Sequence, residues 1–194
     1  MKIGFVSLGC SKNLVDTEMM IRYYKDKGME IEPNPARAEI IVINTCGFIE
    51  SAKQEAIDTI LEMAEYKKIG VCETLIVTGC LVERYLDELK EELPEVDLFI
   101  PIRDYDKVFE KLDYMKREIS TQNYAYLKIA EGCSNNCTYC AIPYIRGKYV
   151  SRPFEEIIDE AKKLYKEGYK EIIVIAQDTT KYGIDLYGKS RFAE

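Results

Sequence analysis

The sequence contains no histidine and no tryptophan among its 194 residues. The absence of histidine removes the most frequent general base and the most common nitrogen ligand for metal ions. Any metal chemistry must therefore use thiolates or carboxylates. The sequence also lacks an apolar run of about 18 residues, so no membrane span is predicted. Residues 1–10 fit a buried strand better than a secretory signal, which favours a cytoplasmic location.

An excess of acidic residues gives the chain a formal net charge of -7 at pH 7. Binding of bare nucleic acid relies on Lys and Arg side chains that neutralise phosphates. The acidic balance therefore disfavours a nucleic-acid partner and favours a basic protein. The length allows one large domain or two small ones.

Short apolar runs alternate with segments of helical periodicity over residues 1–116. Predicted strands and helices occupy residues 2–8, 14–27, 29–32, 39–45, 49–66, 74–78, 82–93, 96–102 and 105–116. Strands that alternate with helices in this way form parallel sheets with right-handed crossovers. We therefore expect an N-terminal α/β domain with a doubly wound parallel sheet and helices on both faces.

The polar stretch over residues 117–123 is predicted to link a first domain, residues 1–116, to a second, residues 124–194. The second domain has a predicted strand, helix and strand at residues 124–130, 154–167 and 170–176. Two βα repeats cannot close a barrel or bury both faces of their sheet. We therefore expect an incomplete domain, the truncated start of a partial (β/α) barrel.

Three of the seven cysteines, Cys133, Cys137 and Cys140, lie in one short loop. A loop with this spacing can wrap three thiolates around a small inorganic core. A structural zinc site uses four ligands, but no fourth cysteine is near and histidine is absent. A 4Fe–4S cluster held by three cysteines would leave one iron open for an external ligand. The alternatives are a zinc site with a distant ligand and an ordinary loop with buried thiols.

Cys10, Cys46 and Cys80 each follow an apolar run that is predicted to be a strand. The carboxyl ends of parallel strands lie at one edge of a sheet, where ligands bind. We therefore expect these cysteines to meet in space and to hold a second cluster with an open iron. The alternative is three buried core cysteines, since cysteine is among the most buried residue types. Cys72 precedes a predicted strand and is expected to be structural.

The spacing of the loop cysteines, with the aromatic Tyr139 directly before the last of them, resembles the signature of the radical S-adenosylmethionine superfamily. Two cluster sites, the first on an N-terminal α/β domain, further resemble the methylthiotransferase family over essentially the whole chain. The resemblance implies two 4Fe–4S clusters and S-adenosylmethionine as cofactors. It also implies replacement of a C–H bond by C–S–CH3 on the substrate.

Residues 8–16, 44–53 and 176–180 resemble the branch of this family that modifies an aspartate on a small-subunit ribosomal protein. The resemblance therefore implies a ribosomal-protein substrate. A tRNA-adenosine methylthiotransferase, an iron–sulfur electron-transfer module and a zinc-stabilised scaffold are the alternatives. Family members also carry the rest of the barrel and a C-terminal substrate-binding domain, so we expect this chain alone to be inactive.

The resemblance implies contacts to S-adenosylmethionine beside the cluster loop and after the second barrel strand. Tyr139, Gln177 and Asp178 occupy these positions and are the predicted cofactor-binding residues. Helix capping is the alternative role for the Gln177–Asp178 pair. The sequence identifies neither a catalytic residue nor the electron donor.

Arg146, Lys148 and Arg152 form a cationic stretch after the cluster loop. One interpretation is contact with a carboxylate of the cofactor or of a substrate aspartate. The other is a solvated loop, because short charge runs usually lie on the surface.

Overall fold

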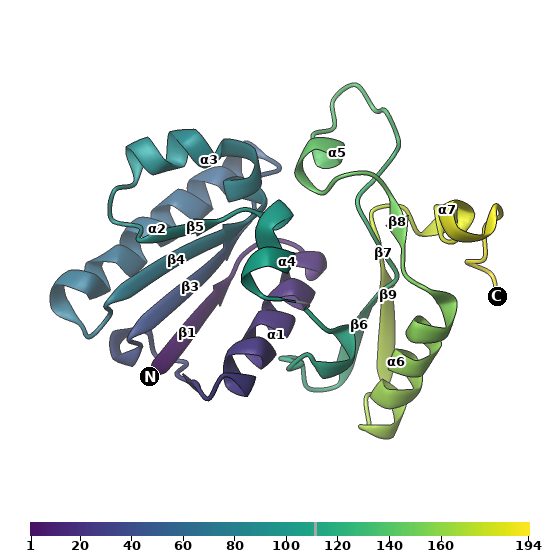
Figure 1. Ribbon diagram of the computed structural model, residues 1–194, viewed down its shortest axis with the longest axis horizontal. Helices are drawn as coiled ribbons and strands as arrows, with labels where there is room; N and C mark the ends of the chain where they lie inside the picture. Colours follow the sequence, from purple (N-terminus) through teal and green to yellow (C-terminus); the bar gives the residue numbers. More distant parts are fainter. Residues whose placement is uncertain (111) are drawn as a thin grey trace. The chain divides into compact units, whose positions relative to one another are not determined.

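The computed structural model describes residues 1–110 and 112–194 (Figure 1). These residues form two compact units, Met1–Glu118 and Ile119–Glu194. Among the described helices, none is both long and apolar enough to cross a membrane.

The boundary between the units lies within the predicted linker, residues 117–123. The first residues of that stretch belong to the fold of the first unit. The guanidinium of Arg117 pairs with the carboxylate of Glu18 at 2.6 Å, and both side chains are buried. The amide of Glu118 donates to the carbonyl of Glu18 at 3.0 Å. These contacts fasten the end of the first unit to one of its helices.

The first unit contains a five-stranded sheet in which every neighbouring pair is parallel. Its strands are β1 (Lys2–Ser7), β2 (Glu30–Ile31), β3 (Ile40–Thr45), β4 (Thr74–Gly79) and β5 (Leu98–Ile100). They are arranged in the order β2-β1-β3-β4-β5. Ser7 lies opposite Asn44, and Asn44 lies opposite Thr78, so β1, β3 and β4 end at nearly the same level. The parallel sheet predicted from the sequence is confirmed.

Helices cover both faces of this sheet. They are α1 (Ser11–Asp26), α2 (Glu50–Ile69), α3 (Cys80–Glu92) and α4 (Tyr105–Val108), with short 3-10 helices η1 (Pro35–Arg37), η2 (Ile102–Asp104) and η3 (Tyr114–Lys116). Successive residues of β3 point to opposite faces. Ile41 and Ile43 pack in a core with α2 and α3, whereas Ile40 and Val42 pack in a core with α1 and α4. The sheet is therefore doubly wound, as the alternating pattern predicts.

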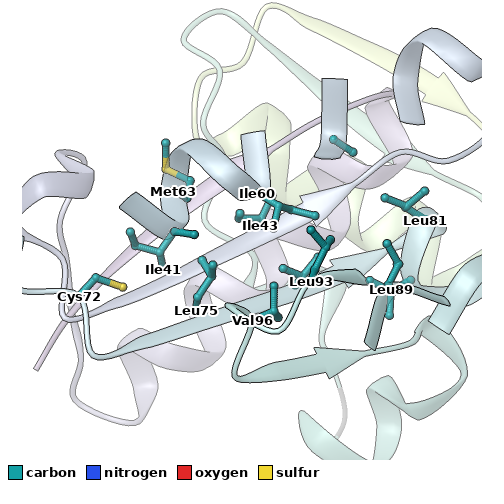
Figure 2. Close-up of a cluster of buried hydrophobic side chains, with 14 of the residues drawn as sticks. Ile41, Ile43, Ile60, Met63, Cys72, Leu75, Leu81, Leu89, Leu93 and Val96 are labelled. Carbon is teal, nitrogen blue, oxygen red and sulfur yellow. The ribbon is translucent and has the colours of Figure 1, made fainter. Parts of the chain in front are cut away.

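Figure 2 shows the core between the sheet and helices α2 and α3. Ile43 of β3 and Ile60 of α2 lie in its middle, and Leu81 of α3 lies at one end. Cys72 lies at the opposite end of this core, just before β4 (Figure 2). Burial raises the pKa of the Cys72 thiol, which disfavours the thiolate that binds metals. This position agrees with the structural role expected for Cys72.

The second unit is built around one βαβ arrangement. Its elements are β6 (Tyr124–Lys128), β7 (Ala130–Glu131), α5 (Ile142–Ile145), β8 (Val150–Ser151), α6 (Phe154–Lys166), β9 (Glu171–Ile175), η4 (Thr179–Lys181) and α7 (Ile184–Tyr187). Strands β6 and β9 pair in parallel, while β7 and β8 form a short antiparallel pair. Ala125 and Leu127 of β6 pack against Ile157 and Leu164 of α6. The predicted strand–helix–strand order is confirmed.

Several predicted elements differ in extent from those observed; the strand predicted over residues 96–102, for example, covers only Leu98–Ile100. The helix predicted over residues 105–116 ends at Val108, because Glu110 has a left-handed backbone with a φ of 58°. Its last residues form the 3-10 helix η3, and residue 111 lies outside the described residues. The strand predicted over residues 124–130 ends at Lys128, and the next two-residue strand pairs with β8 instead of β9.

Candidate metal centres

The three strand-end cysteines lie at the carboxyl edge of the first sheet. Cys10 lies between β1 and α1, Cys46 follows β3, and Cys80 opens α3 directly after β4. Helices cross to opposite faces on either side of the gap between β1 and β3, which makes that gap the topological switch point. Ligands of doubly wound sheets bind at this point. Cys10 and Cys46 therefore lie on either side of the gap between β1 and β3, where a ligand is expected to bind.

Close backbone approaches bring the three cysteine segments together. Gly9 has a φ of +93°, and a Cβ on it would lie 2.7 Å from Cys46 Cβ and 3.2 Å from Cys46 Sγ. A Cβ on Gly47 would lie 2.7 Å from the Cα of the residue after Cys80. The segment that carries Cys46 therefore touches the segments that carry Cys10 and Cys80. This meeting of distant cysteines is what the strand-end pattern predicts.

A buried asparagine lies where these segments meet. The thiols of Cys10 and Cys80 donate to Asn13 Oδ1 over 3.7 and 3.6 Å. Their sulfur atoms are therefore no farther apart than the sum of these two distances. Asn13 Nδ2 donates to the carbonyl of Thr45 at 2.9 Å, and Asn44 Nδ2 donates to the carbonyl of Asn13 at 2.9 Å.

The sequence interpretation missed Asn13 and Asn44 as site residues. Both lie in the two segments that carry the family resemblance, residues 8–16 and 44–53. Position beside the cysteines was the only available signal, because an asparagine near the end of a strand is more often a cap or turn residue.

The strand-end thiols differ in exposure. Cys10 is exposed, Cys46 is half-buried and Cys80 is buried, and all three are free thiols. Exposure of Cys10 disagrees with the alternative in which all three are core cysteines. The group is therefore open to solvent on the Cys10 side and closed on the Cys80 side.

The second group of cysteines lies in the loop after β7. Cys133 is buried, Cys140 half-buried and Cys137 exposed. The amide of Asn135 donates to Cys133 Sγ at 3.4 Å, and the amide of Cys140 donates to the carbonyl of Cys137 at 3.0 Å. A backbone turn therefore links the last two cysteines, and an amide already points at the sulfur of the first.

The base of this loop is closed by backbone contacts. The amide of Cys133 donates to the carbonyl of Gly147 at 3.0 Å. Gly132 has a φ of +69°, and a Cβ on it would lie 2.1 Å from the carbonyl oxygen of Lys148. Only glycine fits this conformation at this close approach.

The side chain of Asp178, a predicted cofactor contact, is bonded to two residues of its own unit, Thr180 and Asn135. It is the N-cap of η4 and accepts from the amide and hydroxyl of Thr180 at 3.2 and 2.6 Å. Its other oxygen accepts from Asn135 Nδ2 at 3.0 Å, and the Oδ1 of that asparagine accepts from Lys181. The hydrogen bonds from Thr180 and Asn135 lower the pKa of Asp178. Asp178 therefore ties the cysteine loop to the residues after β9.

The other two predicted cofactor contacts have different surroundings. Tyr139 is 85% exposed, and Gln177 is half-buried. Tyr139, which directly precedes Cys140, is therefore largely exposed to solvent.

The cationic stretch after the loop is divided between the interior and the surface. Arg146 is buried and pairs with Glu131 at 3.3 Å. Arg152 is buried and pairs with Glu160 at 2.6 Å. Lys148 is exposed. Two of the three cations are therefore held in ion pairs and do not form a solvated patch.

Across the described part of the chain, no group of three or more Cys, Asp or Glu side chains is arranged to hold a metal ion as it stands. A 4Fe–4S core is larger than one ion, and each cysteine binds a different iron, so its ligands are spaced more widely. Each cysteine group offers three free thiols, the donor type that iron–sulfur cores use. Both groups fit such a core by the chemistry of their donors.

A doubly wound unit with strand-end cysteines, followed by a βαβ unit with a three-cysteine loop, defines the class of protein. A family model described as "Uncharacterized protein family UPF0004" matches residues 2–101. A model described as "Radical SAM superfamily" matches residues 127–192. The chain therefore belongs to the UPF0004 family, and its second unit matches the radical S-adenosylmethionine superfamily.

Curated relatives cover the whole chain. It is 56% identical to the ribosomal protein uS12 methylthiotransferase RimO of Alkaliphilus oremlandii, over 100% of this chain and 48% of the relative. The proteins of the same name from Clostridioides difficile and Caldicellulosiruptor saccharolyticus are each 54% identical, over 100% and 99% of this chain and 48% and 49% of the relatives. The chain thus spans about half the length of these relatives. The matches confirm the resemblance found in the sequence.

Proposed function

We propose that this chain is part of an enzyme that attaches a methylthio group to an aspartate of ribosomal protein uS12. The observation that supports this most strongly is identity of 50–56% along nearly the whole chain with relatives of that name. The presence of one cysteine group in each unit supports a division of the cofactors between the units. We assign the first unit as the N-terminal methylthiotransferase domain and the second as the start of the radical S-adenosylmethionine domain.

The proposed cofactors are two 4Fe–4S clusters and S-adenosylmethionine. Cys133, Cys137 and Cys140 would hold one cluster, and the strand-end cysteines would hold the other. When bound, these groups supply the radical and sulfur-transfer chemistry that converts a C–H bond into C–S–CH3. The protein supplies the thiolates and keeps them in place.

Residues around the loop would orient the cofactor. Tyr139 and Gln177 are proposed to contact S-adenosylmethionine from either side of the loop cluster. Asp178 supports the same site by holding Asn135, and hence the loop, against the residues after β9. Arg146 follows the loop and pairs with Glu131, which precedes it, and this ion pair is proposed to hold the two ends of the loop together.

The proposed substrate is a basic ribosomal protein. The formal charge of -7 favours such a partner by electrostatic attraction and disfavours the phosphate backbone of tRNA. The same balance favours this substrate over tRNA, on which the related branch acts.

A direct test uses the complete reading frame that contains this chain, reconstituted with iron and sulfide without oxygen. The purified enzyme is incubated with S-adenosylmethionine, a reductant and either uS12 or tRNA, and both substrates are analysed by mass spectrometry. We expect the mass of one methylthio group on an aspartate of uS12 and none on tRNA. Modified tRNA with unmodified uS12 would contradict the substrate assignment.

A further inference from the structure

The cysteine loop is held by hydrogen bonds at the end that carries Cys133. The amide of Cys133 donates to the carbonyl of Gly147 at 3.0 Å, and its sulfur accepts from the amide of Asn135 at 3.4 Å. Cys133 is buried, whereas Cys137 is exposed and Cys140 is half-buried. A sulfur that accepts a hydrogen bond keeps this contact when it is ionised, so the arrangement suits the thiolate that a cluster requires.

We propose that Asn135 is a positioning residue for the first ligand of the loop cluster, an inference that rests on the proposed cluster site. Its backbone amide donates to the sulfur of Cys133, and its side chain is anchored to the residues after β9. Asn135 Nδ2 donates to the carboxylate of Asp178 at 3.0 Å, and Oδ1 accepts from the ammonium of Lys181. The side-chain anchor therefore holds the backbone donor against the sulfur.

The two anchors fix the orientation of the Asn135 side-chain amide. Exchange of its nitrogen and oxygen would set an acceptor against the carboxylate of Asp178 and a donor against the ammonium of Lys181. Neither pair could form a hydrogen bond, because a carboxylate only accepts and an ammonium only donates. The assignment of these two atoms therefore follows from the chemistry of their partners.

The residue between Cys133 and Asn135 is tied to the same anchor. Ser134 Oγ accepts from the amide of Tyr149 at 3.0 Å, and the Tyr149 hydroxyl donates to the carbonyl of Asp178 at 2.8 Å. Asp178 is itself the N-cap of η4, so the anchor belongs to a hydrogen-bonded turn. Two consecutive residues of the loop are thus linked to one residue after β9.

The contact from Asn135 has two consequences for a cluster bound by the loop. Hydrogen bonds to the ligand sulfurs help to set the reduction potential of an iron–sulfur cluster. A donor at a sulfur stabilises the more negative, reduced state, so a weaker contact should make the cluster harder to reduce. In addition, groups that orient metal ligands typically change metal affinity by about 10- to 100-fold when they are removed.

The test isolates the loop site in the 194-residue chain with Cys10, Cys46 and Cys80 replaced by Ala. Asn135→Ala is compared with Asn136→Ala, which makes the same chemical change at the next position of the loop. Asn136 is exposed, and its side chain makes no hydrogen bond within the part of the chain that the structure describes. Circular dichroism checks that each variant folds, and no S-adenosylmethionine is added.

We expect Asn135→Ala to lose iron to a chelator about tenfold faster than the parent. Its midpoint potential should be more negative than that of the parent, and Asn136→Ala should match the parent in both properties. Equal iron loss and equal potentials in Asn135→Ala and the parent would overturn the role of Asn135. Absence of iron from the parent itself would instead overturn the proposed loop cluster, so the two failures are distinguishable.

A double-mutant cycle tests whether Asn135 acts through Asp178. Asp178→Ala should also speed the loss of iron to the chelator, because it removes the anchor of the Asn135 side chain. The two substitutions break the same link, so their combined effect should be smaller than the sum of the separate effects. Fully additive effects would contradict the link between these two residues.

A measurement on the metal-free chain covers the case in which Asn135→Ala binds no iron. Hydrogen exchange of the amide at position 135, corrected for the intrinsic rate, should be several-fold faster in Asn135→Ala than in the parent. The amide of Cys140 donates to the carbonyl of Cys137 in the same loop and is the internal reference, with an equal rate in both chains. Unchanged exchange at position 135 in a folded variant would contradict the anchoring of this amide by the side chain.

Discussion

The two cysteine groups offer the same donors but are assembled in different ways. The loop group comes from eight consecutive residues, Cys133 to Cys140, held by a backbone turn and by the closed base of the loop. The strand-end group exists only because parallel strands β1, β3 and β4 end at one level. One site therefore depends on local sequence, and the other depends on the integrity of a sheet.

The largest expected effect separates the functions of the two groups in the complete enzyme. Replacement of Cys133, Cys137 and Cys140 by Ala should abolish cleavage of S-adenosylmethionine. Replacement of Cys10, Cys46 and Cys80 by Ala should preserve cleavage and abolish methylthio transfer, because only the sulfur-handling site is lost. Chromatography of the cleavage products measures both. Preserved cleavage in the loop variant would show that the groups are assigned to the wrong roles.

A glycine substitution tests how the sheet assembles its site. Gly9→Ala should cost about 1–3 kcal/mol of unfolding free energy and remove iron from the strand-end site, because its Cβ would overlap Cys46. Gly28→Ala is the matched control, since Gly28 also has a positive φ but nothing lies within 4 Å of its added Cβ. Urea unfolding and iron analysis measure the outcome. Equal iron contents in the two variants would contradict the close approach of Gly9 to Cys46.

A pair of glycine substitutions tests the cysteine loop in the same way, with a smaller expected effect. Gly132→Ala would place a Cβ 2.1 Å from the carbonyl oxygen of Lys148, whereas nothing lies within 4 Å of a Cβ on Gly147. Both have positive φ values, so backbone strain is shared and only the steric overlap differs. We expect Gly132→Ala to lose the loop cluster and Gly147→Ala to keep it. Iron analysis in a background without the strand-end cysteines decides between these results.

The smallest expected effect concerns the seventh cysteine. Cys72→Ala should leave the iron content unchanged and cost on the order of 1 kcal/mol in stability, because it removes one buried thiol from the core. Thermal unfolding and iron analysis of the reconstituted chain measure both quantities. Loss of a cluster in this variant would mean that Cys72 is a ligand and that one of the strand-end assignments is wrong.

Much of the fold was predictable because apolar runs mark buried parallel strands. The convergence of Cys10, Cys46 and Cys80 was also predictable, since it follows from strand direction alone. The order β2-β1-β3-β4-β5 was not, because an alternation of strands and helices is compatible with several strand orders. The early end of α4 was missed because the helical periodicity continues past Glu110, whose left-handed backbone breaks the helix.

Side-chain contacts set the limit of prediction at the candidate sites. The sequence left two interpretations of Arg146 and Arg152 open, contact with a carboxylate of the cofactor or substrate and a solvated loop. Their partners Glu131 and Glu160 lie on other elements and hold both guanidiniums inside. The contact between Asn13 and the Cys80 thiol was not predictable for the same reason, since the two residues lie 67 positions apart in the sequence. Spacing predicts which residues share an edge and does not predict which polar atoms meet there.

The most direct test of the central claim is the iron content of the reconstituted chain and its two triple-cysteine variants. Two 4Fe–4S clusters correspond to about eight irons per chain. We predict that value for the parent and about half of it for each variant, in which Cys133, Cys137 and Cys140 or Cys10, Cys46 and Cys80 are replaced by Ala. Loss of all iron in either variant, or a parent with only about four irons, would contradict two independently assembled cluster sites.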